Sequence, residues 1–269
     1  MAPEGEAPGT PEPGDGPDDL RSASAWPPGR VVVVTATYRE RATIAALCRH
    51  VLAVDPALQL LVVDDDSPDG TADAVREIAR DQPRLHLHVR RGRRGLGSAI
   101  VEGFRAAHRH GFHVAVNMDA DGSHDPDDIP RLLAALEPVG GVPAAVALGS
   151  RRVPGGRTVG WPLSRHVASA LVNWFTRWVV WLPVHDASTG FRAVRLETFA
   201  ALGGAFEPGY AFQEDLLLHI HRAGGRIVEV PITFTNRTEG QSKAGLRQSL
   251  EGIAALLRMA VRARMPSRP

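Results

Sequence analysis

The stretches VVDDDSPDGT, at residues 62–71, and MDADGSHDP, at residues 118–126, decide the fold class of this sequence. Each begins with apolar residues that suit a buried strand and continues directly into carboxylates and turn-forming residues. Around them, short apolar runs alternate with helical patterns. This alternation predicts an α/β fold with a mostly parallel sheet flanked by helices. Because ligands bind at the carboxyl ends of strands in such sheets, both acidic stretches fall where a ligand site is expected.

The individual elements can be placed by their residue patterns. In the first part, strands are predicted at 31–34, 60–63, 85–89, 113–118 and 144–148, and helices at 41–52, 71–80, 98–110 and 126–136. After residue 150 the regular alternation stops. There the patterns predict strands at 191–194 and 226–234 and helices at 166–182, 212–222 and 246–263.

Composition narrows the class of protein. The chain has 269 residues, 43% of them hydrophobic, and a formal net charge of +1. We therefore expect a hydrophobic core of ordinary size. We do not expect the net charge to attract nucleic acid. Residues 1–29 hold six acids, one base, seven prolines and five glycines, so we expect this acidic segment to be disordered. The single cysteine, Cys48, excludes an internal disulfide and a cysteine-based zinc site.

The pair Asp119 and Asp121 suggests a metal site. Side chains at positions i and i+2 of an extended segment share a face, so both carboxylates can point at one spot. Two close carboxylates repel unless a cation or a shared proton relieves them. Mg²⁺ or Mn²⁺ binds oxygen ligands and needs only one or two carboxylates when a diphosphate supplies the rest. The alternative is that these acids cap the helices that begin near Thr71 and Pro126. Two acidic clusters at successive strand ends favour the metal–diphosphate interpretation.

Other enzyme classes fit the spacing less well. A dinucleotide-binding fold needs G-x-G-x-x-G directly after the first strand, whereas the glycines at 92–97 follow the third. A phosphatase of the haloacid dehalogenase type places its paired aspartates after the first strand, and here they follow the fourth. A nucleotidyltransferase that uses the paired aspartates is a related alternative.

Taken together, the motifs resemble those of the polyprenol-phosphate (dolichyl-phosphate) mannosyltransferases, which are inverting family 2 glycosyltransferases with the GT-A, or nucleotide-diphospho-sugar transferase, fold. The matching stretches follow the family's order over about residues 31–243. Besides the two acidic stretches they are TYRE at 37–40, GLG at 95–97, GSR at 149–151, GWPLSR at 160–165, STGFR at 188–192, EVPI at 229–232 and RTEGQSK at 237–243. Ala36 and Arg39 stand where the family usually has Pro and Asn.

The resemblance implies a role for each matching residue. The base and ribose of a sugar nucleotide would be held by Tyr38, Glu40, Val63 and Asp65. Asp119, the backbone of Ala120 and Asp121 would bind the metal and diphosphate, and Ser123 occupies a position that can add a metal ligand. Gln213 matches a donor-contacting position. The donor diphosphate and the acceptor phosphate would meet Arg151, Arg165, Arg237 and Lys243.

The resemblance further implies transfer of mannose from GDP-mannose to a polyprenyl phosphate, with inversion at the anomeric carbon. Asp121, Arg151 and Arg165 are the catalytic candidates. The acceptor phosphate is anionic at pH 7, so no strong general base is required. The alternatives are another donor, such as UDP-glucose, and a non-catalytic sugar-nucleotide-binding module. Residues 30–245 would form the GT-A domain, with a nucleotide-binding half at 30–150 and an acceptor half at 151–245.

A lipid acceptor implies a membrane surface. No run of 18 apolar residues predicts a transmembrane helix, and no basic leader predicts a secretory signal. Four of the five tryptophans lie in 161–181, where they suit a membrane–water boundary, and the basic amphipathic helix and tail at 246–269 suit an anionic lipid surface. The alternative for both segments is packing against the sheet or another subunit. We expect peripheral attachment at the cytoplasmic face, with any firmer anchor supplied by a partner protein.

Overall fold

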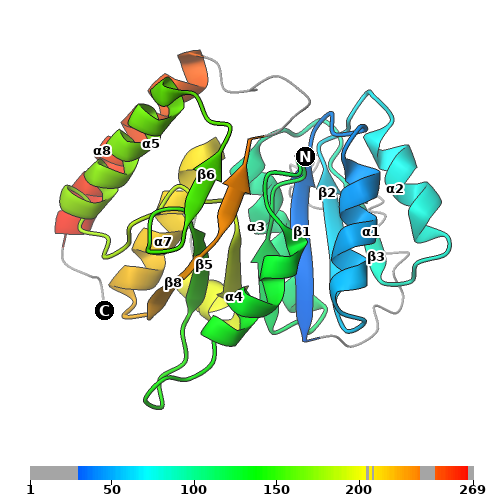
Figure 1. Ribbon diagram of the computed structural model, residues 1–269, viewed down its shortest axis with the longest axis horizontal. Coiled ribbons are helices and arrows are strands. Elements are labelled where there is room, and N and C mark those ends of the chain that lie inside the picture. Colours follow the sequence, from blue (N-terminus) through cyan, green and yellow to red (C-terminus); the bar gives the residue numbers. More distant parts are fainter. Residues whose placement is uncertain (1–29, 204–205, 208, 237–245, 266–269) are drawn as a thin grey trace, which may run out of the picture.

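The computed structural model describes residues 30–203, 206–207, 209–236 and 246–265. A seven-stranded sheet forms its centre (Figure 1). Its strands, in spatial order, are β3 (Leu85–Val89), β2 (Gln59–Asp64), β1 (Val31–Thr37), β4 (Val114–Asn117), β7 (Arg192–Arg195), β5 (Val146–Ser150) and β8 (Ile227–Pro231). Only β7 runs antiparallel to its neighbours, so the predicted mostly parallel sheet is confirmed. The segment 1–29, predicted to be disordered, lies outside the described residues.

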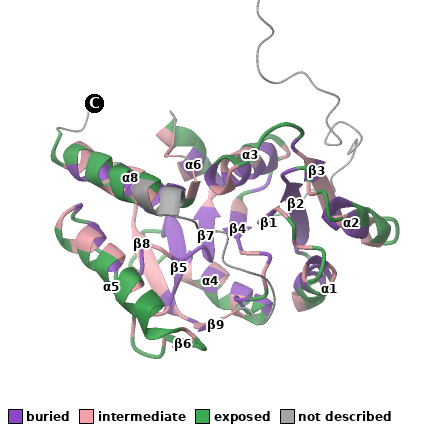
Figure 2. Ribbon diagram, turned by 90° about the horizontal axis from the view of Figure 1, so that it is seen from above, coloured by how far each residue is buried: buried purple, intermediate pink, exposed green. Residues whose placement is uncertain are grey.

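Helices cover both faces of the sheet. The described helices are α1 (Ile44–Val54), α2 (Thr71–Ala79), α3 (Leu96–Arg109), α4 (Ile129–Ala135), α5 (Leu163–Trp178), α6 (Leu196–Leu202), α7 (Phe212–Arg222) and α8 (Leu246–Arg264), with 3-10 turns η2 (Pro126–Asp128) and η3 (Gly209–Ala211). Figure 2 shows the sheet from above, with α3 and α6 on one side and α1 and α4 on the other.

Successive side chains of the strands point alternately into two hydrophobic cores, one on each face of the sheet. In β1, Val32 and Val34 point into the core that contains Phe104 of α3, whereas Val33 points into the core that contains Ile44 of α1. Burial on both faces explains the continuous apolar runs from which the strands were predicted. It also holds the carboxyl ends of β1, β2 and β4 rigidly side by side.

The structure corrects the prediction in the second half of the chain. The predicted strand 226–234 is two strands, β8 and β9 (Thr233–Thr235), and β9 pairs with β6 (Arg157–Val159), which the sequence did not predict. The predicted helix 166–182 is α5, which begins at Leu163 and ends at Trp178. Trp181 follows in a left-handed conformation, with φ of 62°, which an α-helix cannot include. Within the described residues, no helix has the length and apolarity needed to cross a bilayer.

Candidate active site

The two acidic stretches meet at one edge of the sheet. β2 ends at Asp64 and β4 ends at Asn117, and both strands run parallel to β1 on either side of it. Their carboxyl ends therefore open on the same side. The chain entering β7 joins them there, because β7 is antiparallel and its first residue, Arg192, pairs with Asn117. This edge is the candidate active site.

Part of the acidic sequence shapes the loops. Asp64 is fully buried and accepts hydrogen bonds from the hydroxyls of Thr37, at 2.7 Å, and Ser67, at 2.6 Å. Asp125 is the N-cap of η2, and its carboxylate accepts a bond from the backbone N–H of Asp127 at 3.0 Å. The helical turn near Pro126 is therefore capped by Asp125, and not by Asp119 or Asp121.

Asp65 and Tyr38 lie beside the glycine-rich turn that follows β3. The Asp65 carboxylate accepts a bond from the Gly95 backbone N–H at 2.7 Å and lies 3.4 Å from Nε of the buried Arg90. Burial raises the pKa of Asp65, against the lowering effect of Gly95 and Arg90. Arg94, from the same turn, lies over the Tyr38 ring at 4.5 Å. The turn at residues 92–97 is therefore attached to the ends of both β1 and β2.

Two other residues with a predicted base or ribose contact differ in accessibility. The backbone N–H of Glu40 donates to the Thr71 hydroxyl at 3.0 Å, which holds Glu40 in the loop after β1. Val63 is fully buried, and its side chain belongs to the core beneath α3. Glu40 is therefore better placed than the Val63 side chain to contact a ligand at the sheet edge. Both assignments stay predictions.

Asp119 and Asp121 follow β4 directly. The Asp119 side chain is 34% exposed and rests against the chain entering β7, where a Cβ added to Gly190 would lie 2.7 Å from Asp119 Oδ1. Asp121 Oδ1 accepts a bond from the Ser123 backbone N–H at 3.1 Å. Ser123 is buried, as is Ala120. The predicted metal ligands are thus held in a short, well-anchored turn.

The donor set of this turn fits a hard divalent cation. Its side chains offer carboxylate oxygens and a hydroxyl, the ligand types that Mg²⁺ and Mn²⁺ prefer. The nearby imidazole of His124 has Nε2 at 3.9 Å from Asp119 Oδ2, and burial lowers the pKa of His124 to about 4. His124 is therefore neutral at pH 7 and cannot neutralise Asp119. A bound cation, with a diphosphate completing its coordination, would balance Asp119 and Asp121.

Arg151 is engaged by a carboxylate that the sequence did not single out. Its Nε and Nη2 donate to the two oxygens of Asp186, each at 2.7 Å, and its backbone N–H donates to the same carboxylate at 2.9 Å. The Arg151 side chain is 7% exposed and Asp186 is fully buried. Burial raises the pKa of Asp186, but the bonds from Arg151 outweigh this effect and lower it. Direct contact of Arg151 with a phosphate stays a prediction, because these contacts satisfy most of its guanidinium. No sequence motif identifies Asp186 as a residue of the site.

Arg165 is exposed at the start of α5. Its Nη1 donates to Asn236 Oδ1 at 2.8 Å, and its guanidinium lies 4.4 Å from the Trp161 ring centroid. Trp161 in turn packs edge to face on Phe234. Arg165 is therefore a cation presented on an aromatic support beside β9. Two other predicted phosphate ligands, Arg237 and Lys243, lie outside the described residues.

Gln213 and Glu214 lie in the first turn of α7 and are buried. The Gln213 side chain is buried, and among the described residues its Oε1 has no hydrogen-bond partner. Arg192 Nη1 donates to the Gln213 carbonyl oxygen at 2.7 Å. Burial raises the pKa of Glu214 to about 7, although the charge of Arg192 lowers it, and burial lowers the pKa of Arg192 to about 10. The sequence did not single out Glu214. It follows the motif position Gln213 but belongs to no recognisable pattern itself.

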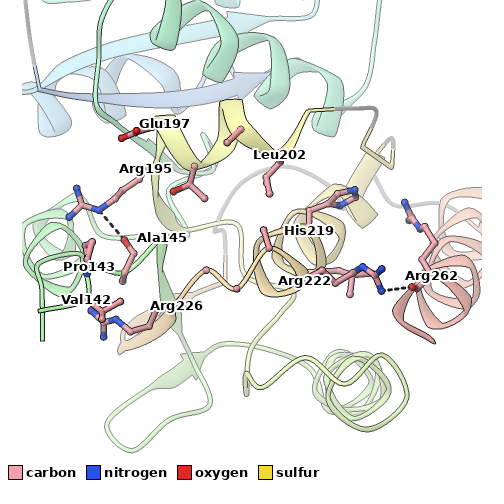
Figure 3. Close-up of a pocket in the computed structure, with 17 residues that line it drawn as sticks. Val142, Pro143, Ala145, Arg195, Glu197, Leu202, His219, Arg222, Arg226 and Arg262 are labelled. Carbon is pink, nitrogen blue, oxygen red and sulfur yellow. Dashed lines mark hydrogen bonds between the residues drawn. The ribbon is translucent and has the colours of Figure 1, made fainter. Parts of the chain in front are cut away.

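A cavity of about 680 Å³ lies at the opposite edge of the sheet, away from the paired aspartates (Figure 3). Its lining includes Arg195, which pairs with the first residue of β4, and Arg222 of α7. Arg195 donates from Nε to the Ala144 carbonyl oxygen at 3.0 Å, and Arg222 donates from Nη1 to the Arg262 carbonyl oxygen at 2.6 Å. These arginines bind main-chain carbonyls and thereby hold the surrounding segments together.

The sheet order, the single reversed strand and the paired aspartates after β4 define the GT-A class of glycosyltransferases, which act on nucleotide-activated sugars. Solved structures share this fold. One is glucosyl-3-phosphoglycerate synthase from Mycobacterium tuberculosis in complex with Mn²⁺, UDP-glucose and phosphoglyceric acid, with a TM-score of 0.65 and 20% identity, covering 90% of this chain and 82% of that one.

The chain belongs to glycosyl transferase family 2, whose model matches residues 32–203. It is 38% identical over 261 residues to polyprenol monophosphomannose synthase of Mycolicibacterium smegmatis, covering 96% of each protein. It is 41% identical over 216 residues to undecaprenyl-phosphate mannosyltransferase of Micrococcus luteus, covering 80% of this chain and 87% of that protein. The family resemblance drawn from the motifs is confirmed.

Proposed function

We propose that this protein transfers mannose from GDP-mannose to a polyprenyl phosphate, with inversion at the anomeric carbon. The observation that carries the proposal is the position of Asp119 and Asp121 at the end of β4 in a family 2 glycosyltransferase. Similarity to two mannosyltransferases named for polyprenyl-type phosphates supports the acceptor class. The identity of the donor, GDP-mannose, requires a test of its own.

The chain's own residues would position two anionic groups against each other. Asp119 and Asp121 would hold a divalent cation, which supplies positive charge to the departing diphosphate. The exposed guanidinium of Arg165 would attract the acceptor phosphate, with Arg237 and Lys243 as further candidates. Because that phosphate is already ionised, positioning and electrostatics suffice, and no side chain has to remove a proton.

The acceptor would be reached from a membrane surface. The outer face of α5 exposes Trp174, at 58%, and Trp178, at 62%, while α8 exposes Ile253 and Leu257. The carboxyl ends of the two segments meet where the Arg264 guanidinium lies 5.4 Å from the Trp181 ring centroid. Exposed tryptophans beside arginines suit a headgroup boundary. We therefore propose peripheral attachment, at the cytoplasmic face.

The decisive experiment is a transfer assay with radiolabelled GDP-mannose, undecaprenyl phosphate and Mg²⁺ or Mn²⁺. Labelled mannose is expected in an organic-soluble product, whereas labelled UDP-glucose yields none. Product from UDP-glucose alone would overturn the donor assignment. Tight binding of GDP-mannose without turnover would favour the non-catalytic module and overturn the proposed reaction.

Membrane contact is tested by flotation with vesicles of phosphatidylcholine and phosphatidylglycerol. The wild-type protein should float, and the Trp174→Ala, Trp178→Ala double variant should remain largely in the bottom fraction. Trp161→Phe is not a suitable control, because Trp161 supports Arg165. Val139→Ala is suitable, since Val139 is 74% exposed on a different surface loop. Equal flotation of wild type and double variant would exclude α5 as the contact.

A further inference from the structure

The segment 186–190, which enters β7, forms the support of the Asp119 carboxylate. Gly190 lies so close that a Cβ built on it would be 2.7 Å from Oδ1 and 3.0 Å from Oδ2 of Asp119. The Asn117 side-chain amide donates to the Gly190 carbonyl oxygen and fixes this backbone to the end of β4. The Asp119 carboxylate therefore cannot move toward this segment, and a shift of the segment would shift the carboxylate.

Core strands hold segment 186–190 from two sides. Arg151, next to the end of β5, donates to both oxygens of Asp186 and, at 3.0 Å, to the Ser188 hydroxyl. Arg192 of β7 donates to the carbonyl oxygens of Ala187 and Thr189. The side chains of both arginines are buried, so these bonds are protected from water.

A third attachment comes from α5. Asn173 Oδ1 accepts a bond from the Ala187 backbone N–H at 2.7 Å, and its Nδ2 donates to the Ser188 hydroxyl at 3.2 Å and to the Ser169 carbonyl oxygen at 2.9 Å. Asparagine is a weak helix former, and its amide competes with the helix backbone. Its presence in the middle of α5, 5% exposed, is explained by this attachment to segment 186–190.

The solvent-exposed side of the same helix carries two tryptophans. Trp174 follows Asn173 directly, and Trp178 lies about one helical turn further on, both more than half exposed. A continuous set of contacts thus runs from the outer face of α5, through Asn173 and segment 186–190, to the Asp119 carboxylate.

We propose that Asn173 is a positioning residue that couples the packing of α5 against segment 186–190 to the metal-binding carboxylate of Asp119. A lipid surface bound to α5 would then tighten binding of the divalent cation. This rests on the proposed function, because it assumes the metal role of Asp119 and the lipid contact of α5. A lipid surface strengthens cation binding only if it binds the protein more tightly when α5 is packed against segment 186–190 than when α5 is displaced. Cation binding then strengthens lipid binding by the same factor.

The test is a Mn²⁺ titration of the full-length protein, with free Mn²⁺ followed by electron paramagnetic resonance and no sugar nucleotide present. Asn173→Leu removes the bonds to Ala187 and Ser188 while keeping the same branched arrangement of heavy atoms. We expect its Mn²⁺ affinity to fall roughly three- to tenfold, the size of typical coupling effects. Thr176→Val is the matched control, because the Thr176 hydroxyl is buried on the same helix and donates to the Asn173 carbonyl oxygen, not to segment 186–190.

Vesicles of phosphatidylcholine and phosphatidylglycerol provide the second arm. They should tighten Mn²⁺ binding to the wild type and to Thr176→Val, and have no such effect on Asn173→Leu. If Asn173→Leu does not fold, as judged by circular dichroism, Asn173→Ala replaces it, since alanine favours the helix and lacks the same bonds.

The outcomes separate this proposal from the reaction itself. Equal Mn²⁺ affinity of wild type and the folded Asn173 variant would overturn the coupling while leaving the transferase proposal intact. A wild type that ignores vesicles would overturn the lipid part. A wild type that binds no Mn²⁺ without a diphosphate would overturn the coupling, while the metal role of Asp119 in the donor complex is tested by the transfer assay. No arm uses mannose transfer as its readout, so loss of transfer alone cannot imitate any of these results.

Discussion

Replacing Asp186 with alanine should cost the protein a large part of its stability. In the folded state the Asp186 carboxylate is fully buried and accepts three bonds from Arg151, two of them at 2.7 Å. Asp186→Ala leaves the Arg151 guanidinium buried without its counter-ion. Breaking one partner of a buried pair typically costs about 3–5 kcal/mol. In a domain of this size each kcal/mol lowers the Tm by about 2–4 °C, so a loss of at least about 6 °C is expected.

The assay is urea unfolding followed by circular dichroism, with two comparison variants. Asp73→Ala removes an exposed ion pair of the same 2.7 Å length, with Arg76 on α2, and should change the free energy of unfolding by less than about 1 kcal/mol. The double variant Arg151→Met, Asp186→Leu should recover most of the lost stability, since no unpaired charge remains. A loss below about 1 kcal/mol for Asp186→Ala would refute this account of the buried pair.

The same pair predicts a pH dependence. Bonds from Arg151 lower the pKa of Asp186 in the folded state, despite the opposing effect of burial. A carboxylate with a depressed folded pKa contributes stability above its unfolded pKa of about 4 and loses it as the pH falls through the folded value. The stability difference between wild type and Asp186→Ala should therefore be constant near neutrality and shrink in acid below about pH 4.

Three further predictions concern the active site. Asp121→Ala should abolish mannose transfer while the circular dichroism spectrum stays unchanged; full activity with Mg²⁺ would contradict its metal role. Arg165→Met should raise the KM for polyprenyl phosphate more than about tenfold without lowering the Tm, because Arg165 is exposed; an unchanged KM would remove it from the acceptor site. Burial raises the pKa of Glu214 to about 7, so its contribution to stability is present below the unfolded pKa and is lost as the pH rises through the folded value. Across pH 5 to 8, the free energy of unfolding of Glu214→Gln should therefore rise relative to that of the wild type, and parallel curves would show that Glu214 does not titrate there.

Residue patterns predicted those parts of the fold that depend on local burial. The helix Phe212–Arg222 and the strand Leu85–Val89 have the predicted bounds, because each has a distinct pattern bounded by turn residues. β6 was missed because Arg157–Val159 is three residues long and half-exposed, too short to show a period. A four-residue strand such as β7 carries no signal of direction, so its antiparallel orientation could not be predicted.

The sequence predicted residues of the candidate site only where they belong to a recognisable motif. Asp119 and Asp121 stand out because acids directly after a strand are unusual. Asp186 and Asn173 do not, since their partners lie 35 and 14 residues away and the contacts exist only after the fold has formed. Glu214 could be noticed only by its burial, which no spacing in α7 reveals.

The reversed strand β7 has a consequence for how this enzyme can change over evolution. β7 comes from the chain after residue 150, yet it lies between β4 and β5, which both precede it in sequence. A chain divided at residue 150 would leave both neighbours of that slot with unsatisfied backbone amides, and neither fragment would have a complete sheet. The parts of the chain before and after residue 150 are interlocked, so neither can be exchanged as a module. Evolutionary change in this fold has to come from its loops instead.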